Sequence, residues 1–393
     1  MDLLVIKNIV SNINSELIKV RRQIHANPEL SFQEVDTSKL IKFYLDLWGV
    51  EYSSGWAEHG VVGLIKGTAY ENSKVIALRA DMDALPIQEE NDLEFKSKNA
   101  GIMHACGHDI HTTCLLGAIY ALHQTKEQWG GTIKFIFQPG EEQLPGGASI
   151  LIQEGVLKNP EVDAILGLHV QPDMAVGQIG ICEGSSMGSS EEIFIELTSS
   201  GGHAAMPHLT GDTVLTAARL ICGIQELWSR IKPPLVPSVV SFGKIQTEGG
   251  ATNVIPGKIS IEGTFRCLDP EFREKFCEAL IPFIDSTVLP FGVKAETKVV
   301  RGYPVLYNNV NLAKIWSELS IQYTDNESVV SIPPRLTAED FARYAEVVPA
   351  CFFRLGTGPS ANVHSPKFIV DEAAIPLGSG ILAWSAIGFL KNV

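Results

Sequence analysis

The sequence is organised around one stretch of ten residues, Met103-His104-Ala105-Cys106-Gly107-His108-Asp109-Ile110-His111-Thr112. The stretch combines three imidazoles, a thiol and a carboxylate, all of which can bind metals. In an extended segment, residues two apart project to the same side, so Cys106 and His108 could bind one metal centre. Asp109 and Thr112 provide N-cap chemistry, and apolar residues then repeat at helical spacing as far as Leu122. The stretch therefore predicts a strand end or loop that enters a helix. The alternative is a histidine-rich helix start with a buried cysteine.

Length and charge limit what the chain can be. Its 393 residues exceed what one hydrophobic core usually supports, so two domains are expected. The formal net charge of −14 repels phosphate backbones and anionic lipids, which argues against nucleic acid or a membrane surface as a partner. The 7 cysteines form an odd, scattered set without a C-x-x-C pair, which is typical of the reducing cytosol. We therefore expect a cytoplasmic protein.

The segment from Ala373 to Leu390 carries no charge and is long enough to span a membrane. It also contains Pro376 and several glycines, and the rest of the chain has the composition of a soluble protein. The sequence therefore favours a buried C-terminal helix over a transmembrane span. Residues 1–14 lack the apolar core and cleavage site of a secretory signal.

The first part of the chain alternates between strand and helix patterns. Apolar runs of strand length occur at Val75–Leu78, Thr132–Phe137 and Val162–His169, with helical patterns between them. This order predicts an α/β fold with a mainly parallel sheet and helices on both faces. Functional side chains of such sheets gather beyond the carboxyl ends of the strands. Five polar residues occupy such positions: Asp81, Asp83, Glu141, Glu142 and His169.

The pattern changes near Met187. Strand, helix, two strands, helix and strand follow in order, which predicts a compact α+β domain of ferredoxin-like type. After about residue 303 the strand and helix alternation returns. We therefore expect a catalytic domain formed by residues 1–186 and 301–393, interrupted by an inserted domain at residues 187–300.

Four residues outside the central stretch have the chemistry of a metallohydrolase site. Of the pair Glu141-Glu142, one carboxylate could bind a metal while the other collects a proton from the metal-bound water. We assign Glu142 to the metal and Glu141 to the general base. His169 is a candidate ligand because it ends a predicted parallel strand, whereas a satisfied core histidine is the alternative. The surroundings of His364 do not decide between a ligand and a loop residue.

Three further candidates lie in the predicted inserted domain. His203 follows two glycines and could stabilise a developing oxyanion, and Asn253 could donate a hydrogen bond to the same oxygen. Arg266 ends a predicted strand and could hold a substrate carboxylate, although a surface ion pair is the default for such a residue. Taken singly, all three could be ordinary loop or surface residues.

One motif indicates a different chemistry. Gly184-Ser185-Ser186-Met187-Gly188 fits G-x-S-x-G, the nucleophile elbow of serine hydrolases. A nucleophile elbow joins a strand to a helix, but here an alternating strand pattern follows the motif. We interpret it as a chance match, with a serine esterase that uses Ser186 as the alternative.

Several of these segments together resemble the M20 family of metallopeptidases and amidohydrolases. The similar segments are His104–Thr112, Gln138–Glu142, Gly167–Val170, Gly201–His208, Asn253–Pro256 and His364–Phe368. The branch that they resemble contains hippurate hydrolases, auxin-conjugate hydrolases and N-acetyl-diaminopimelate deacetylases. The segments occur in the family's order through nearly the whole chain, which makes the resemblance far more specific than any one motif.

The resemblance implies a binuclear metal site and a dimer. Two divalent ions would be bound by the residues that match the family's ligands, with a bridging thiolate from Cys106: Cys106, His108, Glu142, His169 and His364. Glu141 would be the general base. The inserted domain would be a lid and dimerisation domain, whose His203 and Asn253 would help to stabilise the tetrahedral intermediate.

The sequence departs from other branches of the family at Asp81-Met82-Asp83, where those branches carry His-x-Asp. A ligand histidine is therefore absent, and Asp83 would orient a ligand from outside the metal's coordination sphere. The role of Asp81 stays open. So does the metal, because a thiolate suits zinc, cobalt or nickel while manganese serves in similar proteins.

We therefore expect a metal-dependent amidohydrolase that cleaves the amide bond of N-acyl amino acids, of hippurate or N-acetyl amino acid type. A metal-bound hydroxide would attack the acyl carbon, and Arg266 is a candidate for binding the substrate's α-carboxylate. The alternatives are the serine esterase and a metal-binding protein without catalytic activity. The sequence does not disclose the acyl group or the amino acid.

Overall fold

The computed structural model describes residues 2–392, and the chain forms two compact units. Unit 1 contains Met1–Gly184, Tyr307–Pro333 and Asp340–Val393. Unit 2 contains Ser185–Leu306 and also the short segment Pro334–Glu339. This segment groups with unit 2 because the Gly188 amide donates hydrogen bonds to the carbonyls of Arg335 and Thr337. The inserted domain predicted at residues 187–300 is therefore shorter than unit 2 at both ends and lacks this segment.

Unit 1 is built on an eight-stranded sheet in the order β1-β2-β4-β3-β5-β16-β6-β15. Its strands are β1 (Tyr52–Trp56), β2 (Gly60–Thr68), β3 (Val75–Asp81), β4 (Gly130–Gln138), β5 (Ala164–Ala175), β6 (Ile179–Ile181), β15 (Val329–Ser331) and β16 (Ala350–Gly358). The four central strands run parallel, while β2 and β6 pair antiparallel with the ends of this group. The predicted mainly parallel sheet is therefore confirmed, with its antiparallel pairs toward the edges.

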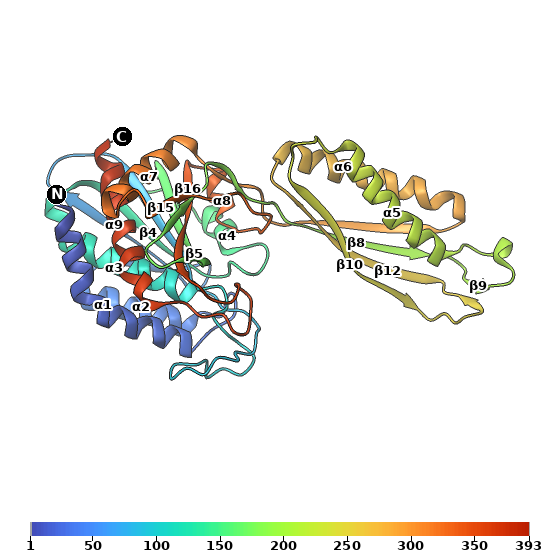
Figure 1. Ribbon diagram of the computed structural model, residues 1–393, viewed down its shortest axis with the longest axis horizontal. Coiled ribbons are helices and arrows are strands. Elements are labelled where there is room, and N and C mark those ends of the chain that lie inside the picture. Colours follow the sequence, from blue (N-terminus) through green and yellow to red (C-terminus); the bar gives the residue numbers. More distant parts are fainter. Residues whose placement is uncertain (1, 393) are drawn as a thin grey trace. The chain divides into compact units, whose positions relative to one another are not determined.

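Helices cover both faces of this sheet. They are α1 (Leu3–Ala26), α2 (Val35–Trp48), α3 (His108–Gln124), α4 (Gly147–Gln153), α7 (Val310–Tyr323), α8 (Ala342–Ala345) and α9 (Ile375–Asn392), with the 3-10 turns η1 (Lys126–Gln128) and η4 (Glu372–Ala374). Consecutive strand residues point to opposite faces. On β16, Phe353 packs on Trp316 of α7, whereas Phe352 stacks on Phe341 beside α8. Figure 1 shows α4 and α8 on the other side of the strands from α1 and α3.

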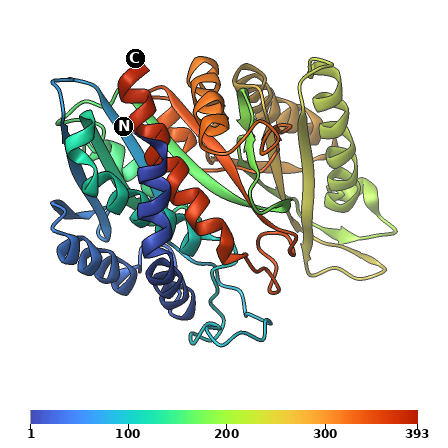
Figure 2. The same cartoon turned by 60° about the vertical axis from the view of Figure 1, so that its left-hand side comes forward.

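Helix α9 lies inside unit 1. The segment Glu372–Lys391 is long and apolar enough to cross a membrane, but 78% of its most apolar window is buried. In Figure 2, α9 runs beside α1 and in front of the sheet. Its side chains Ile381, Leu382 and Ile387 belong to the core that also holds residues of α1 and α3. The structure thus agrees with the expected buried helix.

Unit 2 is a separate α/β layer structure with its own core. Strands β8 (Glu191–Thr198), β10 (Ser238–Glu248), β12 (Lys258–Cys267) and β13 (Lys294–Arg301) form an antiparallel sheet in the order β10-β12-β8-β13. Helices α5 (Thr213–Ile231) and α6 (Pro270–Val288) pack on it (Figure 1). This order and connectivity define the ferredoxin-like arrangement. The short elements of unit 2 are β9 (Gly202–His203), β11 (Val254–Ile255), η2 (Pro207–Leu209) and η3 (Leu289–Phe291), while β7 (Gly184–Met187) and β14 (Leu306–Asn308) each include residues of both units.

Two local predictions about site-bearing elements were wrong. Helix α3 begins at His108, before the proposed caps Asp109 and Thr112, because Gly107 adopts a left-handed conformation that turns the chain directly into the helix. Cys106 and His108 therefore do not lie on one extended segment. His169 lies within β5 and not at its end, because pairing with β16 carries the strand on to Ala175.

Candidate metal centre

The turn before α3 places Cys106 and His108 on either side of a glycine with φ of 91°. Only glycine adopts this conformation without strain. A Cβ atom on Gly107 would also lie 2.4 Å from Cγ2 of Val170 on β5. The turn is therefore packed closely against the strand that carries His169, which brings three candidate ligands from two elements together.

In each of the two buried candidate histidines, His108 and His169, the Nδ1 atom contacts another protein group that orients the ring. Nδ1 of His108 lies 3.2 Å from Oδ1 of Asp83, and Nδ1 of His169 lies 2.7 Å from the carbonyl oxygen of Val170. Nε2 of His169 lies 3.3 Å from the sulfur of Cys106. Nε2 of His108 is buried and has no hydrogen-bond partner among the described residues. Buried polar atoms normally have partners, so this nitrogen indicates a missing ligand.

Glu142 and His364 approach the same sulfur. Nε2 of His364 lies 3.3 Å from Oε1 of Glu142, and the ligand atoms of both residues lie within 4.8 Å of Cys106 Sγ. His364 is half exposed, but its backbone amide donates a hydrogen bond of 2.7 Å to the carbonyl oxygen of Ala105. This bond fixes the loop of His364 to the segment that carries the cysteine.

The five predicted ligands form two groups that share one thiol. Cys106, His108 and His169 make one group, and Cys106, Glu142 and His364 make the other. Ligand atoms bound at about 2.0–2.3 Å to one tetrahedral ion lie roughly 3–4 Å apart. The two separations of 3.3 Å, from Cys106 Sγ to His169 Nε2 and from His364 Nε2 to Glu142 Oε1, fall in this range, and the sulfur of Cys106 belongs to both groups. A divalent pair therefore suits this donor set.

The charges in this cluster depend strongly on one another. Burial raises the pKa of Cys106, and the carboxylate of Glu142 adds to the effect. Hydrogen bonds to Cys106 and Glu142 raise the pKa of His364 to about 10. Burial lowers the pKa of His169, with a further contribution from the Arg354 guanidinium. A divalent cation beside the sulfur would favour the thiolate and the neutral imidazoles that bind it.

Glu141 lies beside the ligand cluster and not opposite it. Its carboxylate is within 4.8 Å of the ligand atoms of His108 and Glu142, and the side chain is buried. Its Oε1 accepts a hydrogen bond of 3.4 Å from the Asp340 amide. A carboxylate in this position can accept a proton from a molecule that is bound at the candidate metal centre.

Comparison with known proteins identifies the family. Residues 77–386 match the peptidase family M20/M25/M40. The chain belongs to this family. It is therefore a hydrolase of amide bonds and a metal-binding enzyme.

Several members of the M20/M25/M40 family are similar over nearly their whole length. IAA-amino acid hydrolase ILR1-like 5 of Arabidopsis thaliana is 39% identical over 96% of this chain and 87% of its own. N-acetyl-L-cysteine deacetylase of Bacillus subtilis strain 168 is 37% identical over 98% and 90%. The crystal structure of Bacillus subtilis YXEP protein, a dinuclear metal binding peptidase of the M20 family, superposes with a TM-score of 0.84 at 35% identity, covering 98% of this chain and 100% of that one. The family and this neighbour indicate two divalent ions.

The structure places Asp81 in contact with His111, which the sequence did not predict. Its Oδ1 lies 2.6 Å from Nδ1 of His111, and Nε2 of His111 accepts a hydrogen bond of 2.9 Å from the Val170 amide. Asp81 also pairs with the buried guanidinium of Arg79. Asp81 and His111 thus hold the backbone next to His169. The only signal in the sequence was a third histidine in the central stretch.

Asp83 contacts two parts of the site. Oδ1 lies next to Nδ1 of His108, while Oδ2 accepts hydrogen bonds from the Glu142 amide at 2.9 Å and the Ser31 hydroxyl at 2.6 Å. Burial works to raise the pKa of Asp83, but the bond to His108 and its charge outweigh burial and lower it. Asp83 is therefore a charged group in contact with His108, and the orienting role that the family resemblance implies for it stays a prediction.

The three candidates in unit 2 do not lie together. His203 on β9 pairs with Val254, and the Asn253 carbonyl accepts a hydrogen bond of 2.9 Å from the Ala204 amide, so His203 and Asn253 are neighbours. Their loop is attached near Gly257, where the Ser199 amide donates to the Gly257 carbonyl. Arg266 is at the other end of β12, roughly 25–30 Å away at about 3.3 Å per residue. Within one chain, Arg266 is too far from the other two to share a small substrate with them.

The serine motif lacks the geometry of a nucleophile elbow. Ser186 lies on the short strand β7, and its carbonyl accepts a hydrogen bond from the Arg335 amide. The next regular element is strand β8 and not a helix. Because the elbow presents its serine at a tight turn from strand to helix, this placement argues against a serine nucleophile.

Proposed function

We propose that the protein hydrolyses the amide bond of N-acyl amino acids, releasing a carboxylate and a free amino acid. One observation carries the proposal: the five candidate ligands converge on the thiol of Cys106 with Glu141 beside them. The relatives named as an IAA-amino acid hydrolase and an N-acetyl-L-cysteine deacetylase support this substrate class. The proposed cofactor is a pair of divalent ions, of zinc, manganese, cobalt or nickel. They would be held by the five candidate ligands Cys106, His108, Glu142, His169 and His364.

In the proposed reaction, Glu141 moves the proton. The bound ions would supply Lewis-acid activation of the carbonyl and of water. One carboxylate oxygen of Glu141 takes a proton from the attacking water as its oxygen bonds to the acyl carbon. The same proton then passes to the amide nitrogen as the C–N bond breaks, which yields a neutral amine. Asp83 holds His108 through Nδ1 during both steps.

We further propose that the active form is a homodimer made through unit 2. His203 and Asn253 would stabilise the oxyanion of a site to which Arg266 of the other protomer brings the substrate carboxylate. Their separation from Arg266 within one chain supports this arrangement. Exposed apolar side chains near His203 also support an interface: Met206, Leu209, Val214 and Leu215.

The substrate proposal is tested with a panel of N-acetyl, N-benzoyl and longer acyl amino acids. Activity should disappear with EDTA and return with Mn²⁺, Zn²⁺ or Co²⁺, and the preferred ion identifies the metal. Ser186→Ala is the matched control and should leave the rate unchanged. Hydrolysis that resists chelation, or its loss in Ser186→Ala, would refute the metal-dependent reaction.

The dimer proposal is tested by mixing two inactive variants. In a mixture of His203→Ala and Glu141→Gln, one site of each mixed dimer has an intact Glu141 and an intact His203 from its partner, so activity should reappear. Light scattering reports the oligomeric state directly. A monomer with full activity, or no recovery from dimers that exchange subunits, would refute a His203 that acts across the interface.

A further inference from the structure

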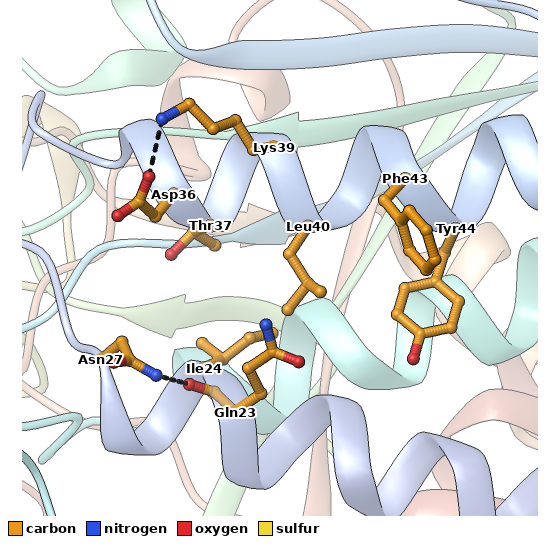
Figure 3. Close-up of a pocket in the computed structure, with 9 residues that line it drawn as sticks. All are labelled: Gln23, Ile24, Asn27, Asp36, Thr37, Lys39, Leu40, Phe43 and Tyr44. Atoms are coloured by element: carbon orange, nitrogen blue, oxygen red, sulfur yellow. Dashed lines mark hydrogen bonds and ion pairs between the residues drawn. The ribbon is translucent and has the colours of Figure 1, made fainter.

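The segment between α1 and α2 reaches the candidate metal centre, although it lies outside the residues matched by the family. Figure 3 shows Asn27 and Asp36, which lie on either side of it, and the surface groove between the two helices. Nδ2 of Asn27 donates to the Gln23 carbonyl, and Asp36 pairs with Lys39. None of the residues that line this groove is a candidate site residue. Between these anchors, in contrast, the side chains of Ser31 and Glu34 are buried.

Glu34 binds the backbone just before the proposed base. It is fully buried, and its Oε1 accepts a hydrogen bond of 2.8 Å from the Gly140 amide. Its Oε2 has no hydrogen-bond partner among the described residues. Burial raises the pKa of Glu34 to about 8, and the charge of Asp83 adds to this effect. The side chain therefore holds the Gly140 amide as a largely neutral carboxyl at neutral pH.

Ser31 acts on the other side of the base through Asp83. Its hydroxyl donates to Oδ2 of Asp83, the same oxygen that accepts the Glu142 amide. The amides of the residues directly before and after Glu141 are thus both held by carboxyl groups, Glu34 and Asp83. The segment Ser31–Glu34 supplies one of these two carboxyl groups, Glu34, and contacts the other, Asp83, through the Ser31 hydroxyl.

Phe32 shows that the segment is held in an unfavourable conformation. Its φ is 63°, in the left-handed region that is unfavourable for a residue other than glycine. A Cβ atom on Gly140 would lie 2.3 Å from the Phe32 ring, so the ring packs directly on that glycine. Such strain persists only where surrounding contacts impose it, and it is common next to functional sites.

We propose that Ser31, Phe32 and Glu34 are positioning residues that fix the backbone on both sides of Glu141. The inference rests on the proposed role of Glu141 as the base. Since a misplacement of about 1 Å can cost roughly 100-fold in rate, a loosened Gly140–Glu142 segment should slow the chemical step. In Glu34→Ala, substrate affinity and metal content should change little, because the Glu142 amide keeps its hydrogen bond to Asp83.

The experiment compares Glu34→Ala with Glu34→Gln in the metal-loaded enzyme. Glutamine keeps an oxygen that can accept the Gly140 amide, so its kcat should stay within about twofold of wild type, whereas alanine should lower kcat at least about tenfold with little change in KM. Glu29→Ala is the matched control. Among the described residues, the Glu29 carboxylate accepts the Asp36 and Thr37 amides at the start of α2, so its loss disturbs the same segment without touching Gly140.

Hydrogen exchange gives a readout that does not depend on turnover. In the metal-free protein, peptides that contain Gly140 should exchange faster in Glu34→Ala than in Glu34→Gln or Glu29→Ala. Ser31→Ala, which removes a single hydroxyl, provides the same test at the Glu142 amide if Glu34→Ala does not fold. Unchanged exchange at both amides, or an equal loss of kcat in Glu29→Ala, would overturn the positioning role.

The two proposals fail separately. If Glu141→Gln keeps wild-type activity, then the proposed function is wrong whatever Glu34 does. If Glu141→Gln is inactive while Glu34→Ala keeps both its kcat and its protection at Gly140, then the mechanism stands and the positioning inference is wrong.

Discussion

Glu141 is the side chain on which the proposed reaction depends most directly. Glu141→Gln keeps the size of the side chain but cannot take a proton, so we expect kcat to fall by about 100- to 10,000-fold. Metal content should not change, because Glu142 and not Glu141 is the proposed ligand. Steady-state kinetics and metal analysis of the same preparation check both parts. A variant that loses metal along with activity would make Glu141 a ligand.

Glu34 provides a test at the same scale through pH. Its pKa in the folded protein is about 8, above its ordinary value of 4.5, so the folded state keeps the proton longer than the unfolded state. The contribution to stability is complete below about pH 4.5 and is lost as pH rises toward 8, at up to about 1.4 kcal/mol per pH unit. Glu34→Gln cannot lose this proton. In urea unfolding of the metal-free protein, the free energy of unfolding of Glu34→Gln should therefore rise relative to that of wild type between pH 5 and pH 8. A difference between the two free energies that does not change with pH would contradict this.

Single residues also show where sequence reasoning stopped. The five ligand candidates lie as far apart as Cys106 and His364, and the family resemblance, not spacing, assembled them into one set. Glu34 and Ser31 escaped notice because their partners, Gly140 and Asp83, are distant in sequence and no local pattern links them. The contact between Asp81 and His111 was missed for the same reason.

At the scale of elements, the turn into α3 is the position where a small substitution should disturb the candidate metal centre most. Gly107→Ala would place a methyl group 2.4 Å from Val170 in a backbone conformation that alanine rarely adopts. We expect a loss of about 1–3 kcal/mol in the free energy of unfolding and weaker metal binding, because Cys106 and His108 move with the turn. Gly177→Ala is a control with φ of 98° and no atoms near its Cβ position. Equal metal affinities in the two variants would contradict a special role for this turn.

Elements were predictable where periodicity was strong. The buried strand β3 follows directly from an apolar run, and strand β8 of unit 2 follows from the alternation of its residues. The start of α3 was not predictable, because a glycine between two polar residues does not disclose a left-handed turn. The end of β5 was also missed, since its last residues are fixed by pairing with β16, which is distant in sequence.

At the scale of the whole molecule, the two units have separate hydrophobic cores. The core around Leu166 and Ile381 shares no residue with the core around Ile261 and Phe276. All five candidate ligands belong to unit 1. Bound ions stabilise only the folded state that binds them. Calorimetry should therefore show that EDTA lowers the melting temperature of one transition and leaves a second unchanged, and a uniform shift of all unfolding would contradict this separation.

The interruption of unit 1 by unit 2 has a consequence for synthesis on the ribosome. Strand β16, His364 and helix α9 are made only after the whole of the ferredoxin-like unit has emerged. Domains tend to fold as they are completed during translation, so the unit that begins later can mature first. Until the later segments of unit 1 are synthesised, its first segment exposes the edge of β5 that pairs with β16 and the surface of α3 that packs on α9. We expect the nascent chain to be most prone to aggregation in this interval, before His364 completes the candidate metal centre.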